Sequence, residues 1–217
     1  MKTFIQRDTG EQEVDAKQEL VESILNFPGN LTEKMKNLEK SYNDLFLTSR
    51  SIEELIKRIL SHYNIPVFFP RIGDTNERFD AVFTFDNSKK GLVEIEVPST
   101  EMLDAPRNLL DDIAVYSCRR KLAVELITPI VLCWTLPNKR TDYWNVLKDI
   151  DNILNIKIKT APIMSLAVLY WLEKELDFEN DNFYLDADKL ILGDIIDLLK
   201  DNSVDPSQFS GFFEPIK

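Results

Sequence analysis

Residues 78–97 read RFDAVFTFDNSKKGLVEIEV, and they decide the fold of this 217-residue chain. Two apolar runs are joined by a short linker rich in turn-forming residues, which predicts an antiparallel β-hairpin. Successive side chains of a strand point to opposite faces, so Glu94 and Glu96 share one face of the second strand. Asp80 lies on the polar face of the first strand. If the register agrees, the three carboxylates converge.

The rest of the chain alternates between helical and strand patterns. Apolar residues recur at helical spacing in some segments and form short continuous runs in others. The expected elements are helices over 15–27, 32–48 and 52–63, strands over 67–69, 79–85 and 92–97, a helix over 104–122, a strand over 129–136, a helix over 142–154, a strand over 156–159, and helices over 162–173 and 188–200. Such alternation is typical of α/β domains.

The domain organisation follows from the same pattern. We expect an N-terminal helical appendage over residues 1–49, an α/β core over residues 50–201 and an irregular C-terminal tail over residues 202–217. With 44% hydrophobic residues, the chain can fill one substantial core. No run reaches the length of a membrane span, and the first residues lack the apolar stretch of a signal peptide, so we expect a cytoplasmic protein without membrane association.

Charge and cysteine content exclude some classes of protein. A formal net charge of -11 argues against non-specific coating of nucleic acid, which depends on clustered Lys and Arg. The acidity is uneven, because residues 146–217 carry 7 Lys+Arg against 14 Asp+Glu, whereas residues 50–145 carry 13 against 14. The segment around the hairpin is therefore nearly neutral. The two cysteines, Cys118 and Cys133, lack CxxC spacing, which predicts neither a disulfide framework nor a zinc site.

The order of these elements, with Asp on one strand and Glu-x-Glu on the next, resembles the core of the PD-(D/E)XK nuclease superfamily. The resemblance implies the restriction-endonuclease-like fold, a central mixed sheet flanked by helices. Asp80 matches the first acid of the family motif and Glu94 the second. Glu96 stands where Lys is usual, and Phe79 replaces the usual Pro. Some restriction endonucleases also carry Glu-x-Glu at this place.

The resemblance also implies a function and a set of roles. Asp80 and Glu94 would hold Mg²⁺ or Mn²⁺, with Glu96 as general base or ligand of a second metal, and Glu53 on the preceding helix would reach the metal through water. The chain would then be a metal-dependent endonuclease acting on nucleic acid, more plausibly DNA than RNA. Cutting both strands with one site per chain needs a homodimer, which the N-terminal helices could form.

Basic residues that could contact phosphates occur in the segment that also holds the acids. They are Lys89, Lys90, Arg107, Arg119, Arg120 and Lys121. The last three equally fit favourable placement of cations at a helix C-terminus.

Other interpretations of the acids stay open. Glu94 and Glu96 could form the solvent face of a half-buried strand, and Glu53 could be a solvated helix flank. A second functional hypothesis is a catalytically inactive module that kept the fold and binds nucleic acid or a partner protein. A third is an RNA endonuclease, or the nuclease subunit of a larger assembly.

Overall fold

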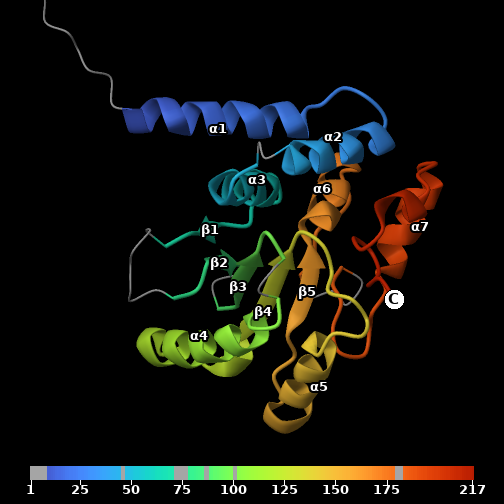
Figure 1. Cartoon of the computed structure of the whole chain (residues 1–217). Helices are drawn as coiled ribbons and strands as arrows, with labels where there is room; N and C mark the ends of the chain where they lie inside the picture. Colours follow the sequence, from blue (N-terminus) through green and yellow to red (C-terminus); the bar gives the residue numbers. More distant parts are fainter. Residues whose placement is uncertain (1–8, 45–46, 71–77, 86–87, 100–101, 179–182) are drawn as a thin grey trace, which may run out of the picture. The chain divides into compact units, whose positions relative to one another are not determined.

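The computed structural model of the chain describes residues 9–44, 47–70, 78–85, 88–99, 102–178 and 183–217. Residues 86–87 of the linker between the two hairpin strands lie outside the described residues. The chain divides into two compact units, Met1–Arg58 and Ile59–Lys217, whereas the sequence pattern placed the division between residues 49 and 50. Figure 1 labels the elements of both units.

The first unit is helical. It contains α1 (Thr9–Leu25), α2 (Leu31–Asn43) and most of α3 (Ser49–His62), and α1 contacts α2. A capping box begins α2, because the Asn30 side chain accepts a hydrogen bond from the Glu33 backbone N–H and the Asn30 N–H donates to the Glu33 carboxylate. The helices expected over 15–27 and 32–48 correspond to α1 and α2.

A five-stranded sheet in the order β1-β2-β3-β4-β5 forms the centre of the second unit. Its strands are β1 (Val67–Phe68), β2 (Ala81–Thr84), β3 (Lys90–Glu96), β4 (Ile127–Cys133) and β5 (Lys159–Pro162). The pairs β1–β2 and β2–β3 are antiparallel, whereas β3–β4 and β4–β5 are parallel, so the sheet is mixed. Ala81 lies opposite Val93, which confirms the predicted antiparallel pairing of the hairpin strands.

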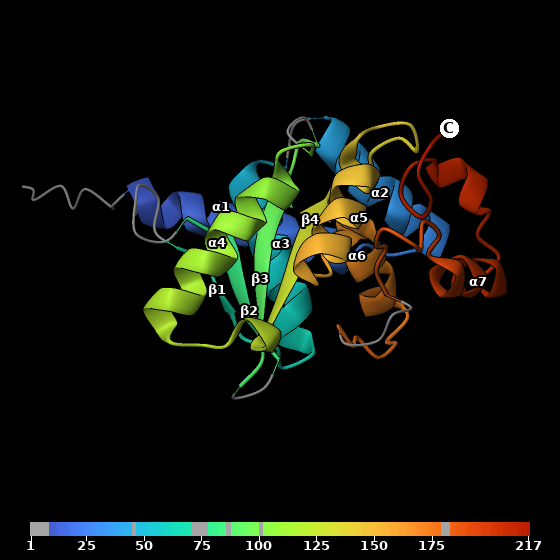
Figure 2. The same ribbon diagram turned by 90° about the horizontal axis from the view of Figure 1, so that it is seen from below.

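Helices provide the crossovers that parallel strands require. Helix α4 (Ala105–Arg120), followed by the 3₁₀ turn Val124–Leu126, connects β3 to β4, and α5 (Tyr143–Leu154) connects β4 to β5. Helix α4 packs on β3 and β4 and contacts α5. In Figure 2 both helices lie in front of the strands, on one face of the sheet. The expected α/β class is confirmed.

The apolar helix α6 (Ile163–Trp171) follows β5 directly, and its first seven residues are buried. The strand expected over 156–159 lies further along the chain, as β5. Strand pairing sets this position. Lys159 pairs with Ile130 of β4, and Thr160 exchanges two backbone hydrogen bonds with Leu185. None of the described helices is long and apolar enough to span a bilayer.

The C-terminal segment, residues 202–217, is irregular apart from one short helical turn. It follows α7 (Gly193–Asp201) and contains a 3₁₀ turn, Pro206–Phe209. Phe209 and Phe213 are buried, and the ring of Phe212 lies edge-on to Trp134 with centroids 5.8 Å apart. Residues 202–217 therefore contribute to the core of the second unit, because the apolar surface of three phenylalanines is withdrawn from water.

Helix α7 also begins later than residue 188. The Leu192 N–H donates to the Phe213 carbonyl at 3.0 Å, and the Asp186 carboxylate accepts from the backbone N–H groups of Asp188 and Lys189. The bonds to Asp186 hold residues 186–189 in a turn. An Asp side chain that binds nearby backbone N–H groups in this way competes with helix formation.

Phe209→Ala should test the role of the C-terminal segment. Phe209 is only 2% exposed, so we expect the substitution to lower the free energy of unfolding by about 3–5 kcal/mol, measured by urea denaturation. The control is Ile153→Ala, at a side chain that is 81% exposed, which should change stability by less than about 0.5 kcal/mol. Equal effects of the two substitutions would contradict the assignment.

Candidate metal centre

Asp80 and Glu94 lie opposite one another across the β2–β3 pair. Asp80 directly precedes β2, and its backbone N–H donates to the Val93 carbonyl at 3.1 Å. The register that pairs Ala81 with Val93 places Asp80 beside Glu94 on the same face. The Asp80 carboxylate also accepts a hydrogen bond from the Ile95 N–H at 2.7 Å. Backbone hydrogen bonds thus position the first acid against the second.

Glu94 and Glu96 are buried, with 8% and 9% of their surfaces exposed. Helix α4 packs on β3, and β4 pairs along the whole length of this strand, so the two glutamates are shielded from solvent. The interpretation of the two glutamates as the solvent face of a half-buried strand is therefore wrong. A buried carboxylate costs free energy unless a hydrogen bond or a cation compensates it.

Helix α4 adds a fourth carboxylate, Asp112, which is 4% exposed. Its side chain hydrogen-bonds with that of Glu94. Asp112 Oδ2 is buried, and no N–H or hydroxyl group of the protein donates a hydrogen bond to it. Asp112 was not among the residues predicted from the sequence, although a signal was present. Asp112 interrupts the apolar stripe of the helix between the buried residues Leu109 and Ile113.

The electrostatics of the cluster favour a proton on Glu94. Burial, the hydrogen bond with Asp112 and the negative charges of Asp80, Asp112 and Glu96 raise the pKa of Glu94 from 4.5 to about 10. That same hydrogen bond lowers the pKa of Asp112, but burial outweighs it, so the net shift of Asp112 is upward. Glu94 thus donates the bond and Asp112 accepts it.

The cluster opens to solvent at Asp80, which is exposed. Partial burial of the Asp80 carboxyl group raises its pKa, and the hydrogen bond from Ile95 opposes that shift. Beside it, an ion pair between Arg78 and Asp111 joins the chain before β2 to α4. The charge of Arg78 lowers the pKa of Asp112. A small cation or a phosphate group would approach from this side.

Glu96 lies on the same face two residues further along β3, opposite Cys133 of β4. Its charge contributes to the raised pKa values of the Cys133 thiol and the Tyr143 hydroxyl, both of which are fully buried. Burial is the larger cause in both. Glu96 therefore lies within electrostatic reach of Glu94 and also of Cys133 on β4 and Tyr143 on α5.

The oxygen donors of the cluster fit a hard divalent cation such as Mg²⁺ or Mn²⁺. Asp112 Oδ2 is a buried acceptor that such an ion would satisfy. In the described part of the chain, no three His, Cys, Asp or Glu side chains converge closely enough to enclose an ion as they stand. Rotation of the side chains of Glu94 and Asp112 away from their mutual hydrogen bond would be part of binding.

Glu53, the fourth acid singled out from the sequence, lies half-buried on α3 within Met1–Arg58, whereas the cluster belongs to the other unit. Its role as a water-mediated metal ligand stays a prediction.

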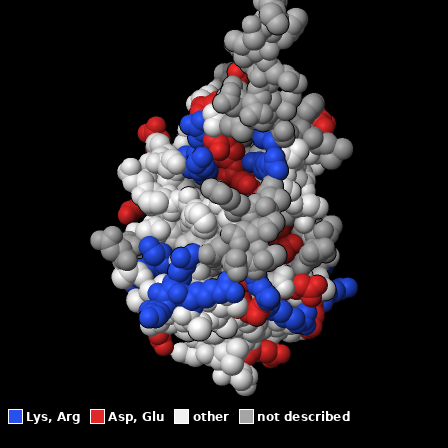
Figure 3. Space-filling view, turned by 90° about the vertical axis from the view of Figure 1, so that its left-hand side faces the viewer, with Lys and Arg blue, Asp and Glu red and all other residues white. Residues whose placement is uncertain are grey.

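Four of the six predicted phosphate-contacting residues lie at the two ends of α4. Arg107 lies in the first turn, and Arg119, Arg120 and Lys121 lie at the exposed C-terminal end. Because a crossover helix runs antiparallel to its strands, this C-terminal end lies near the start of β3, where Lys89 and Lys90 are. Figure 3 shows Lys and Arg side chains in a band across the lower part of one face, with acidic side chains among them.

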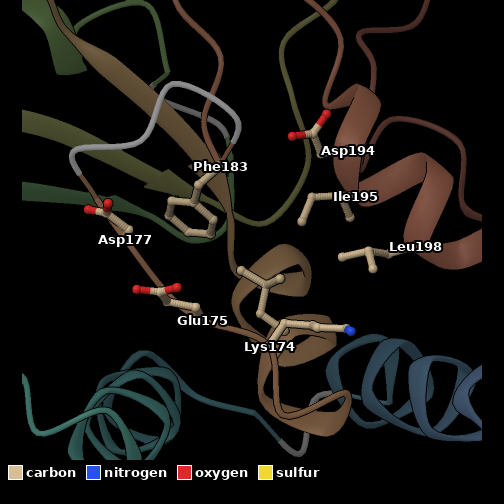
Figure 4. Close-up of a pocket in the computed structure, with 8 residues that line it drawn as sticks. Lys174, Glu175, Asp177, Phe183, Asp194, Ile195 and Leu198 are labelled. Carbon is tan, nitrogen blue, oxygen red and sulfur yellow. The ribbon is translucent and has the colours of Figure 1, made fainter.

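A pocket elsewhere in the second unit contains none of the predicted site residues. Figure 4 shows Glu175 and Asp177 on one side of it and Asp194, Ile195 and Leu198 of α7 on the other. Its lining is mixed, with apolar side chains beside carboxylates. Nothing in it arranges polar groups around a common point.

Comparison with known proteins leaves the cluster to be interpreted from its own chemistry. No protein-family model, no curated protein and no solved structure matches this chain.

The raised pKa of Glu94 predicts a pH dependence of stability. The unfolded chain releases this proton near pH 4.5 while the folded chain keeps it to about 10, so the free energy of unfolding should fall as pH rises through that window. The slope for one proton is about 1.4 kcal/mol per pH unit. Urea denaturation with a metal chelator between about pH 5 and pH 8 should show the fall.

The matched variants are Glu94→Gln, which should flatten this dependence, and Asp149→Asn at an exposed position of α5, which should not. A wild-type stability that is constant or rises over this range would contradict the assignment.

Proposed function

We propose that this protein is a metal-dependent endonuclease that hydrolyses phosphodiester bonds in nucleic acid, with DNA the favoured substrate and Mg²⁺ or Mn²⁺ the cofactor. The observation that carries the proposal is the placement of Asp80 directly opposite Glu94, in a buried cluster of carboxylates that opens to solvent at Asp80. Buried acids that repel one another are expected where a cation binds, because apolar residues at the same positions would give a more stable fold.

Asp80 and Glu94 would hold the ion between the two strands of the hairpin. The hydrogen bond from the Ile95 N–H to Asp80 Oδ2 fixes the carboxylate, and Oδ1 would remain available to the ion. A bound divalent cation lowers the pKa of a water molecule and offsets charge on the scissile phosphate. Glu96, on the same face of β3, would accept the proton of the attacking water.

The arrangement of α4 supports nucleic acid as the substrate. Arg107 and Arg119 lie twelve residues apart on this helix, a separation of roughly 18 Å at 1.5 Å per residue. Asp112 lies between them. Side chains at both ends of the helix could hold a phosphate backbone on either side of the acids, since Lys and Arg position the strand while the metal performs the chemistry.

The resemblance to the PD-(D/E)XK superfamily supports the same proposal. A strand directly preceded by Asp80, a strand with Glu-x-Glu, a crossover helix and a parallel strand occur in this order, in a mixed sheet. A duplex cut on both strands needs two sites, so we further propose that the chain acts as a homodimer.

A second candidate is a catalytically inactive module that binds nucleic acid. Two observations favour it. Glu96 replaces the Lys that the family usually carries, and the raised pKa of Glu94 means that a metal must displace a proton to bind. Such a module would bind DNA through its basic residues without cleaving it.

Cleavage assays separate the two candidates. With Mg²⁺ or Mn²⁺, the full chain should nick plasmid DNA, and Asp80→Ala or Glu94→Gln should lower the rate at least about 100-fold. Asp149→Asn, which removes an exposed carboxylate from α5, should leave the rate unchanged. Single-stranded DNA and RNA tested in parallel identify the preferred polymer. A wild-type protein that binds DNA but leaves every polymer intact would favour the inactive module.

A further inference from the structure

Helix α4 brings a carboxylate to the hairpin acids from a distant part of the sequence. We propose that Asp112 is a ligand residue of the metal centre, so that the ion is held jointly by the β2–β3 hairpin and by α4. This inference rests on the proposed metal site and adds to it a residue that the hairpin motif does not contain.

The position of Asp112 on the helix is the first argument. Leu109 is fully buried and Ile113 nearly so, and Asp112 shares their side of α4. The next-door acid, Asp111, is exposed and pairs with Arg78. Asp111 has the ordinary surroundings of a helix carboxylate, whereas Asp112 points into the interface between helix and sheet.

The hydrogen bonding of Asp112 is the second argument. Its side chain hydrogen-bonds with that of Glu94, and no N–H or hydroxyl group donates to the enclosed Oδ2. Nearly all buried polar atoms in folded proteins are paired, so an orphaned oxygen needs an explanation. An oxygen aimed at a shared cation is the explanation that its neighbours support, because Asp112 also lies within electrostatic reach of Asp80.

A purely structural role fits less well. Asn would make the same hydrogen bond with the Glu94 carboxyl group and would add no negative charge to a site that already contains Asp80 and Glu94. Among the described residues, Arg78 is a cation whose charge reaches Asp112, and it is paired with Asp111. A third carboxylate in this place destabilises the metal-free protein and becomes useful only when a divalent ion is bound.

The test compares Asp112→Asn with Asp111→Asn in the full chain, by calorimetric titration with MnCl₂ and by thermal unfolding with and without Mn²⁺. Both variants remove one negative charge from adjacent positions of one helix. Asp112→Asn should weaken the Kd for Mn²⁺ about 10-fold or more, and Asp111→Asn should leave it nearly unchanged. Without metal, the Tm of Asp112→Asn should equal or exceed that of the wild type, and the rise of Tm on adding Mn²⁺ should shrink.

Three outcomes would overturn the inference. If Asp112→Asn binds Mn²⁺ as the wild type does while Asp80→Asn does not, Asp112 is no ligand but the proposed function stands. If Asp112→Asn lowers the metal-free Tm and leaves the Kd unchanged, the residue is structural. If the wild type itself binds no Mn²⁺, the inference and the proposed function fall together. Asp112→Ser provides the same comparison if the amide disturbs packing.

Discussion

Two neighbouring carboxylates are buried, Glu94 between the sheet and helix α4 and Glu96 beside it on the same strand face, and the candidate site depends on this burial. Burial of charged groups opposes folding unless protons or cations compensate them. In the metal-free protein, compensation comes from the proton that Glu94 shares with Asp112 and from the backbone N–H that binds Asp80. The cluster lowers the stability of the metal-free protein, and the proposed cation would offset that cost.

The sheet topology explains why these acids are covered. Because β3 and β4 are parallel, the chain must cross over between them, and α4 is that crossover. The helix therefore lies on the face that holds Glu94, and one of its inward positions, Asp112, reaches the glutamate. On the other edge of β3 the antiparallel partner β2 leaves Asp80 at its open end, in contact with solvent. The same sheet thus buries Glu94 and leaves Asp80 open to solvent.

Local sequence patterns predicted the hairpin well, since alternation along 92–97 and the turn-forming linker act over a few residues. They misjudged exposure, because the polar face of an isolated strand looks the same whether or not a helix later covers it. Asp112 was missed for this reason, although its place in an apolar stripe was visible. Similarly, the late start of α7 depends on long-range contacts such as the hydrogen bond of Leu192 with Phe213. Such contacts leave no periodic signal.

Crystals of the full chain grown with MnCl₂ offer the most direct test of the central claim, that the carboxylate cluster is a metal site. Anomalous difference density collected at the manganese edge should show one strong peak between the side chains of Asp80 and Glu94, with Mn–O distances of about 2.2 Å. A map without such a peak, in a crystal where Glu94 and Asp112 keep their mutual hydrogen bond, would contradict the account.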